Sequence, residues 1–154
     1  MNVTFARVFM VQLDIPSGFP GIAGLMKYRP DTGKLLLELS ETLLRGDSPL
    51  SVEERELIDA YVSRRNECNF CTVVHGTVAK QLLKHNSNFV DAVYDNVENT
   101  DITDKLKALL KIAAKVQLGG KQASEDDIQQ AKNVGATDRE IHDTVINCSS
   151  FLYV

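Results

Sequence analysis

Apolar positions recur with a period near 3.6 along most of the chain, which is the pattern of helices with one buried face. After Pro30, leucines are spaced for one face of a helix, and Gly46 and Pro49 end that helix. Asp31 or Thr32 is placed to cap its first turn. The apolar face consists of Leu35, Leu36, Leu39, Leu43 and Leu44.

Capping signals divide the rest of the chain into further helices. Ser51 and Glu54 form a capping box, in which each side chain satisfies a free backbone N–H group. Residues 66–68 predict a break, after which a new helix begins near Cys68. Three later helices are predicted to start at Thr103, Ser124 and Thr137. Since no segment alternates polar and apolar residues between turn signals, the pattern predicts an all-α fold of six or seven helices joined by short loops.

The first thirty residues differ from this pattern, because prolines and glycines interrupt them repeatedly. We therefore expect residues 1–30 to form an irregular N-terminal arm that contributes to a subunit interface. A length of 154 residues favours a single domain spanning residues 1–154.

Charge and hydropathy exclude several classes of function. The chain has 17 Lys and Arg against 21 Asp and Glu, a formal net charge of −4. This balance argues against a nucleic-acid partner and against a polybasic membrane-surface protein. The sequence contains neither a run of 18 apolar residues nor the pattern of a secretory signal. We expect a cytoplasmic protein with no membrane partner.

The candidate chemistry is concentrated at Cys68, Cys71 and His75, which fall within an arc of about 60° on one helix face. Both cysteines lie in the predicted first turn, where the helix dipole favours a thiolate. His75 is one turn beyond Cys71 and can accept its proton. Glu56 lies on the preceding helix and can approach His75 if the two helices pack antiparallel. These are the parts that an activated thiol requires.

Four interpretations of this cluster compete. The residues could be ordinary core residues, or they could bind zinc with Cys148 or His85 as a further ligand, although three ligands on one helix face suit tetrahedral geometry poorly. A thioredoxin-like module would need a strand before the pair, where a helix is predicted. We favour a redox-active pair of thiols on a helix. Cys148, among apolar neighbours, is expected to be a buried core thiol.

Glu56 followed by Cys68-x-x-Cys71-x-x-x-His75 resembles the core motif of the alkylhydroperoxidase AhpD and carboxymuconolactone decarboxylase family, and is similar above all to its peroxidase-related members. The resemblance covers roughly residues 20 to 150. Short sequence segments that are similar to those of these members are residues 29–34, 43–46, 55–58, 65–68 and 140–145.

The resemblance implies an AhpD-like helical fold and a homo-oligomer, either a dimer, a trimer or a hexamer. It implies an antioxidant thiol peroxidase that reduces alkyl hydroperoxides through a reversible disulfide, with peroxiredoxin-type activity. By position, Cys71 would be the peroxidatic thiol, Cys68 the resolving thiol, and His75 with Glu56 the proton relay. No bound cofactor or metal is implied; an external dithiol of lipoyl type would be the reductant. Phe70 stands where the hydroperoxidases have a further relay histidine.

Two other functions remain open at this point. One is a carboxymuconolactone decarboxylase-like lyase acting on a small cyclic acid, although decarboxylase members generally lack the cysteine pair. The other is a non-enzymatic module that responds to zinc or to redox state.

Overall fold

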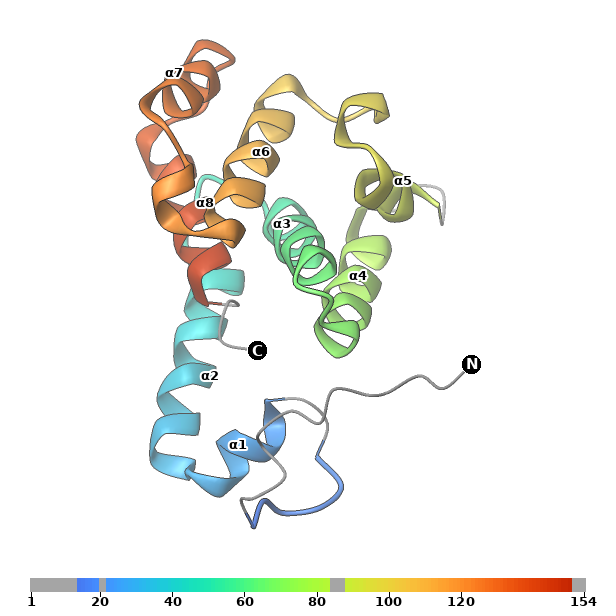
Figure 1. Ribbon diagram of the computed structural model, residues 1–154, viewed down its shortest axis with the longest axis vertical. Helices are drawn as coiled ribbons and strands as arrows, with labels where there is room; N and C mark the ends of the chain where they lie inside the picture. Colours follow the sequence, from blue (N-terminus) through green and yellow to red (C-terminus); the bar gives the residue numbers. More distant parts are fainter. Residues whose placement is uncertain (1–13, 20–21, 84–87, 151–154) are drawn as a thin grey trace.

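The computed structural model describes residues 14–19, 22–83 and 88–150, which form eight α-helices, two single-turn 3-10 helices and connecting turns (Figure 1). The elements are α1 (Ala23–Tyr28), α2 (Pro30–Arg45), α3 (Val52–Arg65), α4 (Asn69–Leu83), α5 (Phe89–Asp95), η2 (Val97–Asn99), α6 (Asp104–Leu118), η3 (Gly120–Gln122), α7 (Glu125–Asn133) and α8 (Asp138–Ser150). The all-α prediction is confirmed, with one α-helix more than the upper expected number. None of the described helices combines the length and hydrophobicity that a membrane span requires.

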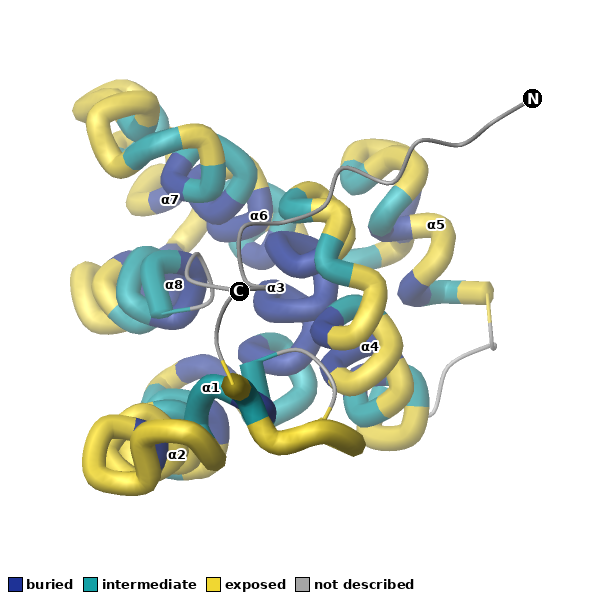
Figure 2. The backbone as a smooth tube through the Cα atoms, turned by 60° about the horizontal axis from the view of Figure 1, so that its bottom comes forward, coloured by how far each residue is buried: buried dark blue, intermediate teal, exposed yellow. Residues whose placement is uncertain are grey.

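Helix α3 is the centre of the molecule. It packs along α4 in an antiparallel pair and also contacts α2, α5, α6 and α8. Figure 2 shows it buried over most of its length, whereas α2 and α7 are largely exposed. Most of the largest fully buried apolar side chains come from α3 and α6, among them Leu57, Ile58, Leu109, Leu110 and Ile112. A helix with five neighbours places its side chains in the interior on every face, and this position decides where the candidate site lies.

Most predicted helix starts are confirmed by their caps. The Ser51–Glu54 capping box is present in full, and the Thr103 hydroxyl accepts a hydrogen bond from the Leu106 N–H group. The start of α2 was predicted wrongly, because Arg29 occupies its N-cap position without a side-chain cap and Pro30 begins the helix. Asp31 instead accepts two hydrogen bonds from the Arg29 guanidinium, at 3.0 and 2.7 Å. Proline at the first position needs no hydrogen-bond acceptor for its nitrogen, so this start requires no polar cap.

The α1–α2 segment differs most from the expectation. Helix α1 forms inside the segment expected to be irregular, and Figure 1 shows α1 and the adjoining half of α2 extending away from the other helices. Of the predicted leucine face on α2, only Leu44 is buried, while Leu35 is 65% exposed. The face is real as a pattern, but the described chain covers it only near Arg45. The part of the predicted arm before residue 14 lies outside the described residues.

Candidate redox site

A tight turn between α3 and α4 places the first cysteine. Asn66 ends α3, and Glu67 adopts a left-handed conformation with φ of 57°, which is uncommon for a residue other than glycine. The Cys68 N–H group then donates to the Ser63 carbonyl at 3.0 Å. The Gln117 side chain of α6 donates to Asn66 at 2.7 Å. These contacts fix the turn against the core, so that Cys68 directly precedes α4.

The two thiols of the motif face each other at the start of α4. Cys68 Sγ and Cys71 Sγ are 2.8 Å apart, and both cysteines are free thiols. The Cys71 N–H group donates to Cys68 Sγ at 3.4 Å, so sulfur occupies the place that a capping oxygen usually takes. A disulfide has an S–S bond of about 2.05 Å. The pair can therefore close with a movement of under about 1 Å, without a change in the helix.

A buried acid and a histidine lie behind this pair. Glu56 Oε2 and His75 Nδ1 are 2.8 Å apart, and Glu56 is only 1% exposed. The other carboxylate oxygen, Oε1, accepts a very short hydrogen bond from Nη2 of Arg45. Burial acts to raise the pKa of Glu56, but the hydrogen bonds from His75 and Arg45 outweigh it and hold this pKa below its ordinary value. Glu56 is thus an ionised carboxylate with a partner on each oxygen.

Arg55 brings Arg45 to this site. Arg55 is buried, and its Nη1 donates to the carbonyls of Leu43 and Gly46 at 2.8 and 2.9 Å. Those carbonyls belong to the end of α2, where the helix leaves acceptors unsatisfied. The side chain of Arg55 therefore joins the end of α2 to α3, and it holds Arg45 beside Glu56.

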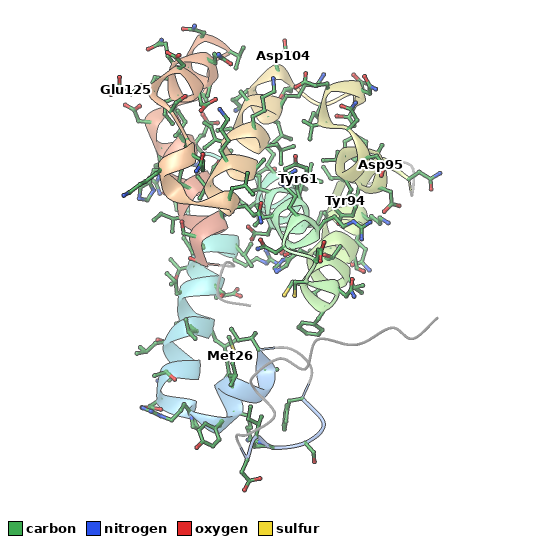
Figure 3. All side chains as sticks on the ribbon, viewed as in Figure 1. Met26, Tyr61, Tyr94, Asp95, Asp104 and Glu125 are labelled. Carbon is green, nitrogen blue, oxygen red and sulfur yellow. The ribbon has the colours of Figure 1, made fainter. Side chains whose placement is uncertain are left out.

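On the other side of α4, Gly76 allows close packing next to His75. A Cβ atom at position 76 would lie 2.6 Å from the Tyr94 hydroxyl of α5, so any larger residue would displace that side chain. Figure 3 shows Tyr61 and Tyr94 on this side. A groove of about 470 Å³ lined in part by Tyr61, Arg65 and Tyr94 lies here. Its Lys115 pairs with Asp127 at 2.6 Å, so that charge is already neutralised within the groove.

The helix terminus favours a thiolate, but the burial of Cys71 opposes one in the resting site. Cys71 is only 6% exposed. Its burial, with the hydrogen bond to Cys68 and the charge of Cys68, raises the pKa of Cys71 to about 12. A helix dipole contributes only about 1 kcal/mol at an exposed end, which is less than the desolvation of a buried anion. Cys71 therefore starts as a neutral thiol and needs a base when it reacts.

The structure brings the four predicted site residues together as two contacting pairs, Cys68 with Cys71 and Glu56 with His75. Cys148 lies elsewhere, fully buried in the apolar core as predicted. His85 lies outside the described residues. Within the described part of the chain, no three His, Cys, Asp or Glu side chains are grouped to hold a metal ion, so the zinc interpretation gains no support there.

Two charged contributors to the site, the partly exposed Arg45 and the buried Asp59, were missed from the sequence. Arg45 sits at the end of a predicted helix, where a basic residue is ordinarily explained by the helix dipole. Asp59 is a fully buried acid one turn from Glu56. Its only sequence signal is its place inside the apolar stretch Leu57–Val62.

The fold and the site together define a class of protein: an AhpD-like helical protein with a Cys-x-x-Cys pair at the start of a helix, backed by a buried Glu–His pair. Residues 30–87 match the sequence model of the carboxymuconolactone decarboxylase family. This match spans the candidate site from Arg45 to His75, and it confirms the resemblance inferred from the motif.

Two solved structures share the fold. A peroxidase-related protein from Ralstonia eutropha JMP134, described as an alkylhydroperoxidase AhpD core, superposes with a TM-score of 0.77 at 27% identity, over 84% of this chain and 68% of that one. A peroxidase-related protein from Silicibacter sp. TM1040 superposes with a TM-score of 0.71 at 25% identity, over 91% of this chain and 83% of that one. No curated protein matches the sequence. The expected AhpD-like fold is thereby confirmed.

Proposed function

We propose that this protein is a thiol-dependent alkyl hydroperoxide reductase that cycles between the Cys68–Cys71 dithiol and a disulfide. The observation that carries the proposal is the 2.8 Å separation of the two thiol sulfurs beside the Glu56–His75 pair. The peroxidase-related names of the two structural neighbours support the same class of reaction.

The first step oxidises Cys71. His75 accepts the proton of the Cys71 thiol, and the thiolate attacks the distal peroxide oxygen. The O–O bond breaks, sulfenic acid forms on Cys71, and the leaving alkoxide takes the proton back from His75 as an alcohol. Because the pKa of Cys71 is about 12, a base within one helical turn is required for this step near neutral pH.

The second step closes the disulfide. The Cys68 sulfur attacks the sulfenic sulfur, its proton leaves with the hydroxyl as water, and the S–S bond forms. An external dithiol then restores both thiols through a mixed disulfide and is itself oxidised. We propose a lipoyl-type dithiol as this reductant. The cycle needs no bound cofactor or metal.

Glu56 and Arg45 prepare His75 for the first step. An ionised carboxylate at Nδ1 orients the imidazole. The hydrogen bonds from His75 and Arg45 keep Glu56 ionised although it is buried. Phe70 is 39% exposed beside the pair and offers no proton, so His75 carries the transfer without a second histidine.

The same proposal includes a homo-oligomer in the cytoplasm. The leucine-rich face of α2 is largely exposed in the single chain, with Leu35 at 65% and Leu39 at 45%. Burial of such a face in an oligomer is favourable by about 25 cal/mol per Å² of apolar surface. A reducing compartment would keep the pair as thiols between turnovers.

The deciding experiment counts free thiols and records the intact mass before and after one equivalent of cumene hydroperoxide. We expect two thiols and about two mass units to be lost, with Cys148 still free. Cys71→Ser should abolish turnover, and Cys68→Ser should stop the cycle at the sulfenic acid. Cys148→Ala is the matched control and should retain the reaction. If all three thiols survive, or if Cys71→Ser turns over peroxide, the proposal is wrong.

The family match favours one alternative, a lyase acting on a small cyclic acid. That reaction would survive the double substitution of Cys68 and Cys71 by serine, whereas the thiol peroxidase would not. The double variant therefore separates the two functions in a single assay.

A further inference from the structure

Helix α3 carries a second buried acid whose carboxylate has no counter-charge in contact with it. Asp59 is fully buried, and neither of its carboxylate oxygens has a hydrogen-bond partner among the described residues. No other aspartate in the described part of the chain is buried. Isolated buried carboxylates are strongly unfavourable in their charged form, so this group needs an explanation of its own.

Asp59 belongs to a polar seam between α3 and α8, which we define as Asp59, Ser63 and Asn147. Glu56, Asp59 and Ser63 fall within an arc of about 60° on α3. All three seam residues are buried, and the Ser63 hydroxyl and the Asn147 amide are also without partners in the described residues. Burial and, next, the proximity of the Asp59 carboxyl group raise the pKa of Cys148, so α8 lies close to Asp59 at Cys148.

The other two members of the seam, Ser63 and Asn147, are uncharged. A hydroxyl and a carboxamide can serve a neutral acid, but they do not balance an anion. The charged and titratable groups that act on Asp59 are Glu56 and Arg55 on α3, Arg45 on α2 and Cys148 on α8. The two arginines are already engaged, Arg45 with Glu56 and Arg55 with the end of α2.

We propose that Asp59 is the proton-holding partner of Glu56, so that the two carboxyl groups together carry one negative charge and one proton at neutral pH. The hydrogen bonds decide which group is charged: Glu56 receives donors on both oxygens, and Asp59 receives none. When the surroundings of two neighbouring carboxyl groups shift their pKa values apart, one group is ionised and acts as a base, and the other keeps its proton. Asp59 acts through Glu56 and is a positioning residue for the relay.

The proton on Asp59 removes a negative charge that would otherwise disturb the Glu56–His75 relay. A second negative charge one turn from Glu56 would repel the Glu56 carboxylate and favour its protonation. A protonated Glu56 would no longer offer His75 an ionised partner. Desolvation, with the charge of Glu56 next, raises the pKa of Asp59 well above its ordinary value, which agrees with this placement. The inference deepens the proposed function and rests on the relay role of Glu56.

The direct test is carbon-13 NMR of the full-length protein with labelled aspartate carboxyl groups. We expect one resonance with the chemical shift of a neutral acid at pH 7, lost in Asp59→Asn and retained in Asp126→Asn, which removes an exposed aspartate. If every aspartate carboxyl is ionised at pH 7, the proposal is overturned. Should Asp59→Asn not fold, the wild-type spectrum alone decides, because a buried neutral acid has only Asp59 as its source in the described chain.

A second readout follows the relay. The rate of Cys71 alkylation by iodoacetamide is measured against pH in a Cys68→Ser background. An alkaline inflection is expected that Asp59→Asn removes and Asp126→Asn retains; a loss of stability alone would leave the shape of the profile unchanged. If the Cys68→Ser protein and its Asp59→Asn variant give superimposable profiles, Asp59 is not coupled to the Glu56–His75 relay. Neither measurement uses peroxide, so failure of the proposed peroxidase activity is seen separately.

Discussion

Helices α3 and α6 are both central, yet they are built on different principles. Helix α6 buries one apolar face, with Leu106, Leu109, Leu110, Ala113 and Val116 inward and charged residues outward. Helix α3 buries nine consecutive residues, Arg55 to Ser63, and four of these are polar or charged (Figure 2). Burial stabilises α6 directly, whereas α3 needs partners for its charges. Helix α3, whose burial requires the desolvation of charged groups, is the helix that supports the candidate chemistry.

The comparison is tested most strongly by removing an apolar side chain from α6. Leu110→Ala leaves a cavity in a fully buried site and should lower the free energy of unfolding by about 2–5 kcal/mol. Urea denaturation measures this change. Leu118→Ala, on the same helix but 68% exposed, is the control and should stay within about 0.5 kcal/mol of wild type. If both variants lost the same free energy of unfolding, α6 would not be stabilised by the burial of one apolar face.

On α3, Glu56→Gln should lower the free energy of unfolding by about 2–3 kcal/mol at pH 7, because His75 and Arg45 lose a buried charged partner. The pKa of Glu56 is lowered in the folded state, so its contribution is present above the unfolded pKa of about 4.3 and is lost as the pH falls through the folded value. The difference between wild type and variant should therefore shrink in acid. A difference independent of pH would show that the charge of Glu56 is not what stabilises the site.

Asp59 should give the opposite dependence on pH. Since its pKa is raised in the folded state, its contribution is complete below the unfolded pKa of about 3.9 and declines as the pH rises toward the folded value. Asp59→Asn should thus gain stability over wild type by about 1.4 kcal/mol for each pH unit in that interval. Urea denaturation between pH 4 and pH 8 measures the trend, with Asp126→Asn as the flat control. If the difference in stability between wild type and Asp59→Asn did not change between pH 4 and pH 8, Asp59 would be charged in the folded protein.

The smallest effect is expected at the start of α6. Thr103→Ala removes the hydroxyl that accepts from the Leu106 N–H group at 3.2 Å and should cost about 1 kcal/mol. Thr103→Ser keeps that oxygen and should restore most of the loss. Thermal denaturation of the two variants checks the order, and cysteine alkylation should be the same in both. A changed alkylation rate would mean that α6 also tunes the site.

Much of the fold follows from local signals. Ser51 with Glu54, Thr103 and Ser124 each begin the helix they predict, because a cap is decided by residues three or four positions apart. The α2 face was less predictable. Its leucines have the right period, but whether a face is covered depends on which elements reach it, and in the described chain Leu35 and Leu39 stay exposed.

The sequence by itself determined that the chain is helical, and that Cys68, Cys71 and His75 share one face of a helix, since a fixed rotation per residue places them there. Only the tertiary structure decided the electrostatics of the site. Arg45, 11 residues before Glu56, reaches it because Arg55 holds the end of α2 against α3. Burial raised the pKa of Cys71 against the helix dipole and left Asp59 without a counter-charge. Desolvation depends on every neighbour in space, and no spacing along the chain encodes it.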